Sequence, residues 1–414
     1  MKKQTGKNAL IFVAITVAID AIGLGIIMPV LPNLIQELTG LGLDEAAIHG
    51  GWLTFTYALM QFIFMPIIGG LSDAYGRRRI MLFSLFFLGL DYLLMGWAPT
   101  ITLLYLGRLI SGATGATYST ANAYIADISP PDKRAQSFGV IGAAFGIGFV
   151  MGPVIGGLLG DMNPRTPFYA AAIAALVNTI YGFFFFPETL KPENRRAFSW
   201  HRANPLGTFK SILALPQLKG FLVVMFLFSF AHFSYPAVFS FFTQHTFEWS
   251  PSDVGIALGF FGVCSAFVQG YLIRIAIPKL GMIQCAIIGS LMNAIAFIGL
   301  GFATSGMIGY FWLIPAALGG LATPAIQHLM SIRVADDAQG ELQGAIGSLS
   351  GLAMLGSPLI MTHLFHSFAA KNAPINFPGA PFLLAGILVA IGLLVFIWSV
   401  RTVPIVANEK SHAE

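Results

Sequence analysis

Long apolar segments separated by short polar ones recur along the whole chain, and this pattern predicts a series of membrane-spanning helices. A helix of about 20 apolar residues is long enough to cross the hydrocarbon core of a bilayer. Such segments occur at roughly 8–34, 47–71, 80–98, 101–125, 136–160, 167–187, 218–244, 253–275, 282–303, 307–330, 342–367 and 379–402. The predicted fold class is therefore an all-α polytopic membrane protein with twelve transmembrane helices and short loops.

The longest polar stretch divides these segments into two sets of six. It predicts an N-terminal half at 1–187, a linker at 188–217 and a C-terminal half at 218–414. The halves share small residues at a constant offset of 205: Gly76, Gly115, Gly139, Gly142, Gly146 and Pro153 correspond to Gly281, Gly320, Gly344, Gly347, Gly351 and Pro358. Because four of these matches fall within one short window, we interpret the two halves as an internal repeat.

Composition agrees with a protein embedded in lipid. Hydrophobic residues make up 56% of the 414 residues, the mean hydropathy is +0.77, and charged residues account for only 10%, whereas soluble domains carry about 25%. This argues against a soluble enzyme, a nucleic-acid binder and a secreted disulfide scaffold. Cys264 and Cys285 have no paired spacing, and the sequence contains neither a metal-ligand cluster nor a phosphate-binding glycine loop. We therefore predict no cofactor, no metal, no ATP-driven pumping and no enzyme activity.

The basic residues predict how the chain is oriented. If both termini are cytoplasmic, all but three of the 22 lysines and arginines fall in cytoplasmic segments, the linker included. Arg165 and Lys371 remain outside, and Arg108 lies within a span. Positive charge concentrates on the cytoplasmic side of membrane proteins, so this orientation is the expected one.

Three charged residues lie inside predicted spans. A carboxylate at the centre of a bilayer costs about 2.5–3.5 kcal/mol on insertion scales, yet Asp20 and Asp91 both occupy apolar segments. Since burial disfavours the charged form, both are candidates for a proton or cation relay; the alternative is a structural carboxyl kept neutral by hydrogen bonds. Arg108 either pairs with a carboxylate beside a cavity or extends to the membrane interface. His232 is a weaker candidate, because a lone histidine in a span is more often structural.

The fifth predicted span carries glycines at intervals of four residues. Gly148, Gly152 and Gly156 would present a small surface on which a neighbouring helix packs closely. Pro153 removes one intrahelical hydrogen bond and permits a bend. The spacing fits a pivoting helix, and it fits equally a helix that uses glycine only for packing.

Several motifs resemble those of the major facilitator superfamily. "GGLSDAYGRRRIML" is similar to the family's loop signature between the second and third spans, "LYLGRLISGATGA" to its fourth-span motif, and "GIGFVMGPVIGG" to the fifth-span motif of drug/proton antiporters. "DAIGLGIIMPVLPNLI", "LDYLLMG" and "QGELQG" resemble the TetA group of tetracycline/proton antiporters. The resemblance implies a bacterial inner-membrane transporter, usually monomeric, with a substrate site between two six-helix halves.

The resemblance also implies roles for individual residues. Asp20, Asp91 and Arg108 match residues of proton-coupled export, and the first two would also contact substrate together with Gln269, Asn293 and, by its aromatic surroundings, His232. A cytoplasmic gate would include Ser72, Asp73, Arg77 and Arg78, together with a charged pair, Asp127 and Arg134; Gly148, Gly152, Pro153 and Gly156 match the antiporter motif. The charged loops would alternatively serve only to anchor the topology.

Three positions depart from the TetA pattern. Asn293 stands where those exporters carry a third membrane aspartate, Ser265 replaces a histidine, and Ala74 replaces an arginine of the loop signature. Because asparagine does not titrate, proton coupling through that position is lost. The departures argue against tetracycline itself as the substrate but leave the transport class unchanged.

The predicted function is export of an amphipathic, drug-like small molecule in exchange for protons, by alternating access. The expected partners are that molecule, protons and the lipid bilayer, and not nucleic acid. An importer of a nutrient or siderophore-like solute with the same fold is the first alternative, and a non-transporting sensor or scaffold is the second.

Overall fold

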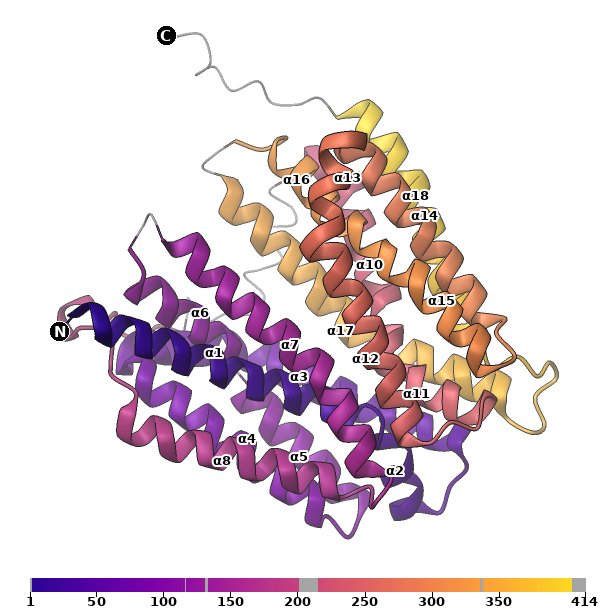
Figure 1. Ribbon diagram of the computed structural model, residues 1–414, viewed down its shortest axis with the longest axis horizontal. Helices are drawn as coiled ribbons and strands as arrows, with labels where there is room; N and C mark the ends of the chain where they lie inside the picture. Colours follow the sequence, from indigo (N-terminus) through magenta and orange to yellow (C-terminus); the bar gives the residue numbers. More distant parts are fainter. Residues whose placement is uncertain (1, 116, 131–132, 201–214, 336–337, 404–414) are drawn as a thin grey trace. The chain divides into compact units, whose positions relative to one another are not determined.

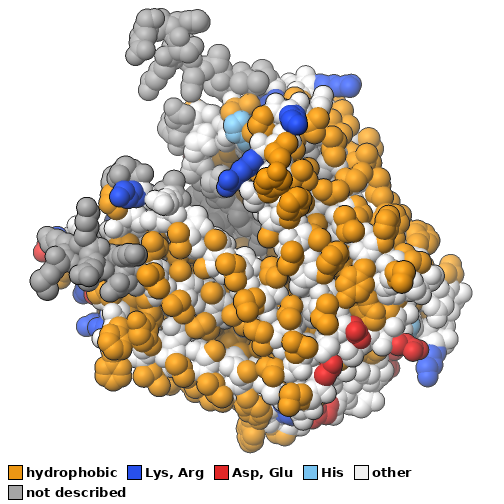
Figure 2. Space-filling model, in the orientation of Figure 1, with side chains coloured by type: hydrophobic (Ala, Val, Ile, Leu, Met, Phe, Trp, Pro, Cys, Tyr) orange, Lys and Arg blue, Asp and Glu red, His pale blue; other side chains and the backbone are white. Residues whose placement is uncertain are grey.

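The computed structural model describes residues 2–115, 117–130, 133–200, 215–335 and 338–403. Within these ranges every regular element is helical, and eleven segments are long and apolar enough to span a membrane. Many large hydrophobic side chains are exposed; in Figure 2 they cover the flanks of the helices, while charged side chains lie toward the helix ends. Lipid-facing helices have this distribution, because they satisfy their backbone groups internally and present apolar side chains outward.

Packing groups the chain into two compact units. The first contains residues 1–205 and 248–259, and the second contains residues 206–247 and 260–414. The boundary after residue 259 falls within the helix Pro251–Phe267, so the first turns of this helix pack in the first unit. Residues 201–214 of the predicted linker lie outside the described residues.

The first unit holds the first six predicted spans (Figure 1). Its helices are α1 (Lys2–Ile27), α2 (Leu31–Thr39), α3 (Leu43–Tyr75), α4 (Arg77–Trp97), α5 (Ile101–Thr114), α6 (Thr117–Ile128), α7 (Arg134–Gly160) and α8 (Thr166–Phe185). α1 ends before Pro29, earlier than the pattern predicts, and the short α2 follows with a proline in its first turn. Proline has no N–H to donate and tolerates only the start of a helix, which explains this division.

The fourth predicted span is formed by two short helices. α5 ends where Gly115 leaves the helical conformation, with ψ of 52°, and α6 begins shortly after it. Such a break leaves backbone groups without their helical partners, and within a span they need a partner from the protein or from a cavity. The side chain of Gln61 on α3 compensates, because its Nε2 donates a hydrogen bond to the Gly115 carbonyl at 3.1 Å.

The second unit is more often interrupted along its spans. Its helices are α10 (Lys219–His232), α11 (Ser234–Thr246), α12 (Pro251–Phe267, which begins in the first unit), α13 (Ile273–Leu280), α14 (Met282–Gly301), α15 (Gly306–Leu318), α16 (Ala322–Ser331), α17 (Gln339–Ala369) and α18 (Ala380–Thr402). A π-helical turn, Val268–Leu272, joins α12 to α13, and a 3₁₀ turn, Gly319–Leu321, joins α15 to α16. The predicted eighth and tenth spans are therefore composite.

The predicted repeat is visible in the backbone. Gly76, between α3 and α4, and Gly281, between α13 and α14, are two of the three glycines with positive φ among the described residues, at 105° and 81°. L-residues with side chains rarely adopt this conformation. Gly115 and Gly320 both lie where a span is broken. The matching small residues thus occupy matching places in the two units.

The glycine face of α7 packs against α1, and the two helices lie side by side in Figure 1. A side chain at Gly148, Gly152 or Gly156 would collide with the backbone of α1, at the carbonyls of Ala18 and Ile22 and at Ile26 respectively. These glycines therefore allow α1 and α7 to approach at backbone distance, which holds α1 and its Asp20 in place.

Candidate functional site

Asp91 and Arg108 form an ion pair inside the first unit. Arg108 Nη2 on α5 lies 2.7 Å from Asp91 Oδ2 on α4, and the two residues are 8% and 1% exposed. The guanidinium also lies over the ring of Tyr57, 5.5 Å from its centroid. The sequence left two placements open for Arg108. In the structure Arg108 pairs with a carboxylate and does not extend to the membrane interface.

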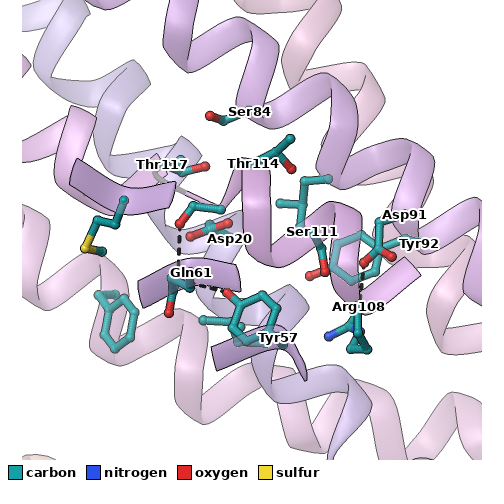
Figure 3. A pocket seen from close by; sticks show the side chains of 15 residues that line it. Asp20, Tyr57, Gln61, Ser84, Asp91, Tyr92, Arg108, Ser111, Thr114 and Thr117 are labelled. Atoms are coloured by element: carbon teal, nitrogen blue, oxygen red, sulfur yellow. Dashed lines mark hydrogen bonds and ion pairs between the residues drawn. The ribbon is translucent and has the colours of Figure 1, made fainter. Parts of the chain in front are cut away.

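Asp20 lies on the wall of the same cavity. The cavity has a volume of 290 Å³ and lies between α1, α3, α4, α5, α6 and α7. Figure 3 shows Asp20, Asp91 and Arg108 around it. Neither an ion pair nor a hydrogen bond joins Asp20 to another described side chain, whereas Asp91 is paired. The structure therefore brings together all three predicted proton-coupling residues and leaves one carboxylate facing the cavity.

Most of the polar wall was not predicted from the sequence. Gln61 and Tyr57 lie one turn apart on α3, and Gln61 Nε2 donates to the Tyr57 hydroxyl oxygen at 3.1 Å. The wall also contains hydroxyl groups from three helices, those of Ser84, Tyr92, Ser111, Thr114 and Thr117, with Leu24, Met65, Leu88 and Phe145 as its apolar part. The available signal was a polar residue within an otherwise apolar helix. The sequence does not show which face of each helix is buried, so this signal alone could not identify the residues of the cavity wall.

The chemistry of this wall follows from its charges. One negative and one positive group neutralise each other, and the Asp20 carboxyl remains to be neutralised by a proton or by a cationic group. Hydroxyl and amide groups around it are able to bind polar atoms of a small molecule, while Met65 and Phe145 contact apolar ones. The cavity is therefore suited to an amphipathic ligand and to a proton.

The other predicted substrate-binding residues belong to the second unit. Asn293 Nδ2 on α14 lies 3.0 Å from His232 Nε2 on α10, and His232 Nδ1 lies 2.8 Å from the Phe228 carbonyl. This arrangement requires the neutral tautomer in which Nδ1 donates and Nε2 accepts. The ring lies against Phe297. Gln269 lies on the π-helical turn and is exposed, so it does not join this pair.

The predicted gate residues gather around Arg77 at the start of α4. The Arg77 side chain forms ion pairs with Asp73 and with Asp127, the latter at 3.3 Å, and donates to the Ser72 hydroxyl at 3.0 Å. Arg78 donates to the Phe183 carbonyl at the end of α8. The loop signature, the end of α6 and the end of α8 are therefore joined at one place.

The expected pair between Asp127 and Arg134 is not formed. Arg134, at the start of α7, donates to the Ala126 carbonyl at 3.2 Å, and the Asp127 carboxylate is bound by Arg77 instead. A cation beside the last carbonyls of a helix is stabilised by the helix dipole, which explains the preference of Arg134 for the end of α6.

Glu188 is a further member of the loop cluster that the sequence analysis missed. Its carboxylate accepts hydrogen bonds from the backbone N–H groups of Arg77 and Arg78, at 3.0 and 3.3 Å, and from those of Thr189 and Leu190. It thus binds the free N–H groups at the start of α4, as a capping residue does. Its position in the predicted linker gave no indication of this role.

Comparison with known proteins identifies the family. A family model described as Major Facilitator Superfamily matches residues 13–358. The chain belongs to the major facilitator superfamily. It is 38% identical over 363 residues to the class C tetracycline resistance protein of Escherichia coli, covering 88% of this chain and 91% of that protein. It is 28% identical over 410 residues to multidrug resistance protein 2 of Bacillus subtilis, covering 96% of this chain and 97% of that protein.

Solved structures support the same fold. A bacterial homolog of the human lysosomal transporter Spinster matches 96% of this chain and 98% of its own with a TM-score of 0.77, at 14% identity. The human organic anion transporter MFSD10 matches 94% and 99% with a TM-score of 0.70, at 22% identity. These comparisons confirm the predicted major facilitator fold and the resemblance to the TetA group, and the protein is a multi-pass membrane protein.

Proposed function

We propose that this major facilitator protein is a proton-coupled secondary transporter that exports an amphipathic, drug-like molecule in exchange for protons. Its relatives named for tetracycline and multidrug resistance support export of a drug and do not favour the importer alternative. We further propose that it acts as a monomer in a bacterial inner membrane with both termini in the cytoplasm, an orientation supported by the positions of the basic residues.

The observation that carries this proposal is the unequal state of two carboxyl groups in one cavity. Asp91 is neutralised by Arg108, whereas Asp20 lacks an ion pair with any described residue. A charged group within a span is costly unless it is neutralised. Asp20 therefore either holds a proton or faces a cationic group of the substrate, and the exclusion of one by the other couples their movements.

The residue assignments follow from this coupling. Asp20 is the group that binds a proton or the substrate in turn. The Asp91–Arg108 pair is neutral while Asp91 is ionised, and protonation of Asp91 would leave the positive charge of Arg108 unbalanced. We propose substrate contacts to Asp20 and Asp91 from the first half and to His232, Asn293 and Gln269 from the second. The α1–α7 contact at Gly148, Gly152, Pro153 and Gly156 would be the antiporter element that sets the position of α1 during transport.

We propose that the Arg77 cluster restrains the cytoplasmic loop. Ser72, Asp73, Arg78 and Asp127 would hold Arg77 in one arrangement, and release of these charge-assisted bonds would accompany opening. Arg134 would anchor the end of α6. Simple anchoring of the topology by positive charge predicts instead that the acidic residues are dispensable.

The test is drug exchange in proteoliposomes under an imposed pH gradient, with tetracycline and ethidium as first probes. Asp20→Asn should abolish pH-driven uptake into inside-out vesicles while the protein remains folded by thermal unfolding. Glu45→Gln, which changes an exposed acid in the first turn of α3 outside the cavity, should retain it. Full activity of Asp20→Asn would contradict the assignment of Asp20, and drug movement independent of the gradient in the unmodified protein would contradict proton coupling.

A further inference from the structure

Four buried polar atoms on the wall of the cavity lack hydrogen-bond partners. They are Ser84 Oγ, Asp91 Oδ1, Arg108 Nε and Ser111 Oγ, and their residues are at most 8% exposed. Leaving one buried polar atom unsatisfied costs about 1–3 kcal/mol. Such groups in native proteins are normally satisfied by protein or by ordered water. Four of them on the wall of one cavity therefore indicate that water occupies the polar part of that cavity.

The position of Asp91 Oδ1 shows where this site begins. The oxygen lies against the backbone of α5 at Gly107, where an added Cβ would be only 2.6 Å away. Ser111 is one turn further along the same face of α5, and it lines the same cavity as Asp91. Neither Ser111 Oγ nor Asp91 Oδ1 completes a hydrogen bond of ordinary geometry. One water able to donate and accept would satisfy both.

We propose that Ser111 is the proton-relaying residue of Asp91: its hydroxyl, with a water bound beside it, connects the Asp91 carboxyl to the cavity that contains Asp20. This inference rests on the proposed function, because it explains how a carboxyl enclosed by an ion pair exchanges its proton. Ser111 is suited to the task because its hydroxyl both donates and accepts. Thr114, one turn away on the same cavity wall, is not free in this way, since its hydroxyl donates to the Ile110 carbonyl at 2.9 Å.

The transfer conserves atoms and charge. When Asp91 is protonated and Asp20 is ionised, Asp91 gives its proton to the bound water, which gives one of its own to Ser111 Oγ. Ser111 gives its hydroxyl proton to the next water, and that water gives one of its protons to the Asp20 carboxylate. Each intermediate oxygen ends with its original number of protons. The charge left on Asp91 lies 2.7 Å from Arg108 Nη2. The titratable or charged groups facing the cavity are Asp20 on α1, Tyr57 on α3, Asp91 and Tyr92 on α4, and Arg108 on α5.

The test compares Ser111→Thr with Ser111→Val, because these variants have the same shape and differ only in the hydroxyl. The full-length protein in lipid bilayers is transferred to D₂O buffer while infrared spectroscopy follows the carboxylic acid C=O band that Asp91→Asn removes. Ser111→Val should slow hydrogen–deuterium exchange of this band about 100-fold, the lower end of what a positioned proton-transfer group contributes. Ser111→Thr and the control Thr114→Val should exchange at the rate of the unmodified protein.

Equal exchange rates in Ser111→Val and Ser111→Thr would overturn the proposal, and so would the absence of any Asp91-dependent acid band down to the pH at which the protein unfolds. If Ser111→Val fails to fold, Ser111→Ala replaces it, with slowing relative to Ser111→Thr as the expected result and equal rates as the contrary one. The measurement uses no drug. If Ser111→Val and Ser111→Thr exchange deuterium at equal rates while drug exchange still follows the pH gradient, the relay is wrong and the proposed function stands. If Ser111→Val slows deuterium exchange but drug movement does not depend on pH, the relay stands and the proposed function is wrong.

Discussion

The two units have similar backbones and different polar interiors. At the repeat offset of 205 residues, Asp20, Asp91 and Arg108 of the first unit correspond to Met225, Ala296 and Leu313 of the second, all of which are buried and apolar. In the opposite direction, Asn293 corresponds to Leu88, which lines the cavity of the first unit. The glycines that shape helices are shared, whereas the ionisable groups within spans are not.

This difference indicates which unit exchanges protons. In the first unit, two carboxyls and a guanidinium border one cavity, so the protonation of one alters the others. In the second, Asn293 Nδ2 donates to His232 Nε2 at 3.0 Å, so the two residues meet as neutral groups, while Asn293 Oδ1 remains without a hydrogen-bond partner. We therefore assign proton exchange to the first unit and neutral substrate contacts to the second.

The largest expected effect comes from breaking the buried ion pair. Arg108→Ala leaves the Asp91 carboxylate buried without its partner, which should lower the free energy of unfolding by about 3–5 kcal/mol. The combined variant Asp91→Asn with Arg108→Gln should recover much of that loss, because no uncompensated charge remains. Denaturant unfolding in detergent micelles measures both, with the exposed Arg79→Ala as control. A loss in the combined variant as large as in Arg108→Ala would show that the two residues do not act as a pair.

Gln61→Leu should have the next largest effect on stability. It removes the donor to the Gly115 carbonyl at the break between α5 and α6, and the net contribution of such a part-buried hydrogen bond is about 0.5–1.5 kcal/mol. The second unit closes its corresponding break with a 3₁₀ turn. Thermal unfolding should show the loss, and Gln136→Leu at an exposed position should not. Equal melting temperatures for the two variants would mean that the break needs no side-chain partner.

Asn293→Asp tests the difference between the two units, because it adds an ionisable group to the second unit. The new carboxyl would lie beside His232, and their interaction would hold or release an additional proton. The reversal potential of drug exchange in proteoliposomes should then report about one more proton per cycle, because binding of substrate and proton are linked. Gln284→Glu, at an exposed position of the same helix as Asn293, serves as the control. An unchanged proton number would show that this position is isolated from transport.

Glu188→Gln should have the smallest effect. It weakens the carboxylate cap at the start of α4, which is worth about 0.5–1 kcal/mol at an exposed helix end. Chemical unfolding of this variant should be compared with that of Glu193→Gln, an exposed acid of the same segment. If the two variants unfold alike, Glu188 does not stabilise the loop.

The sequence predicted the fold class, the repeat and the three charged residues of the cavity, because burying a charge among apolar residues is visible without a structure. It did not predict Gln61, since whether a polar side chain faces inward depends on the rotation of α3 and on the break at Gly115. The partner of Asp127 was assigned to Arg134, which is nearer in sequence, but Arg77 reaches it in space. Glu188 was missed because its hydrogen bonds join residues that are 110 and 111 positions apart.

The most direct test of the account is the release of protons when a transported drug binds to the purified protein in weakly buffered solution. The unmodified protein and His232→Gln are expected to release a proton on binding, whereas Asp20→Asn is expected to bind the drug without releasing one. Equal release from Asp20→Asn, or its loss in His232→Gln alone, would contradict the assignment of proton exchange to the first unit.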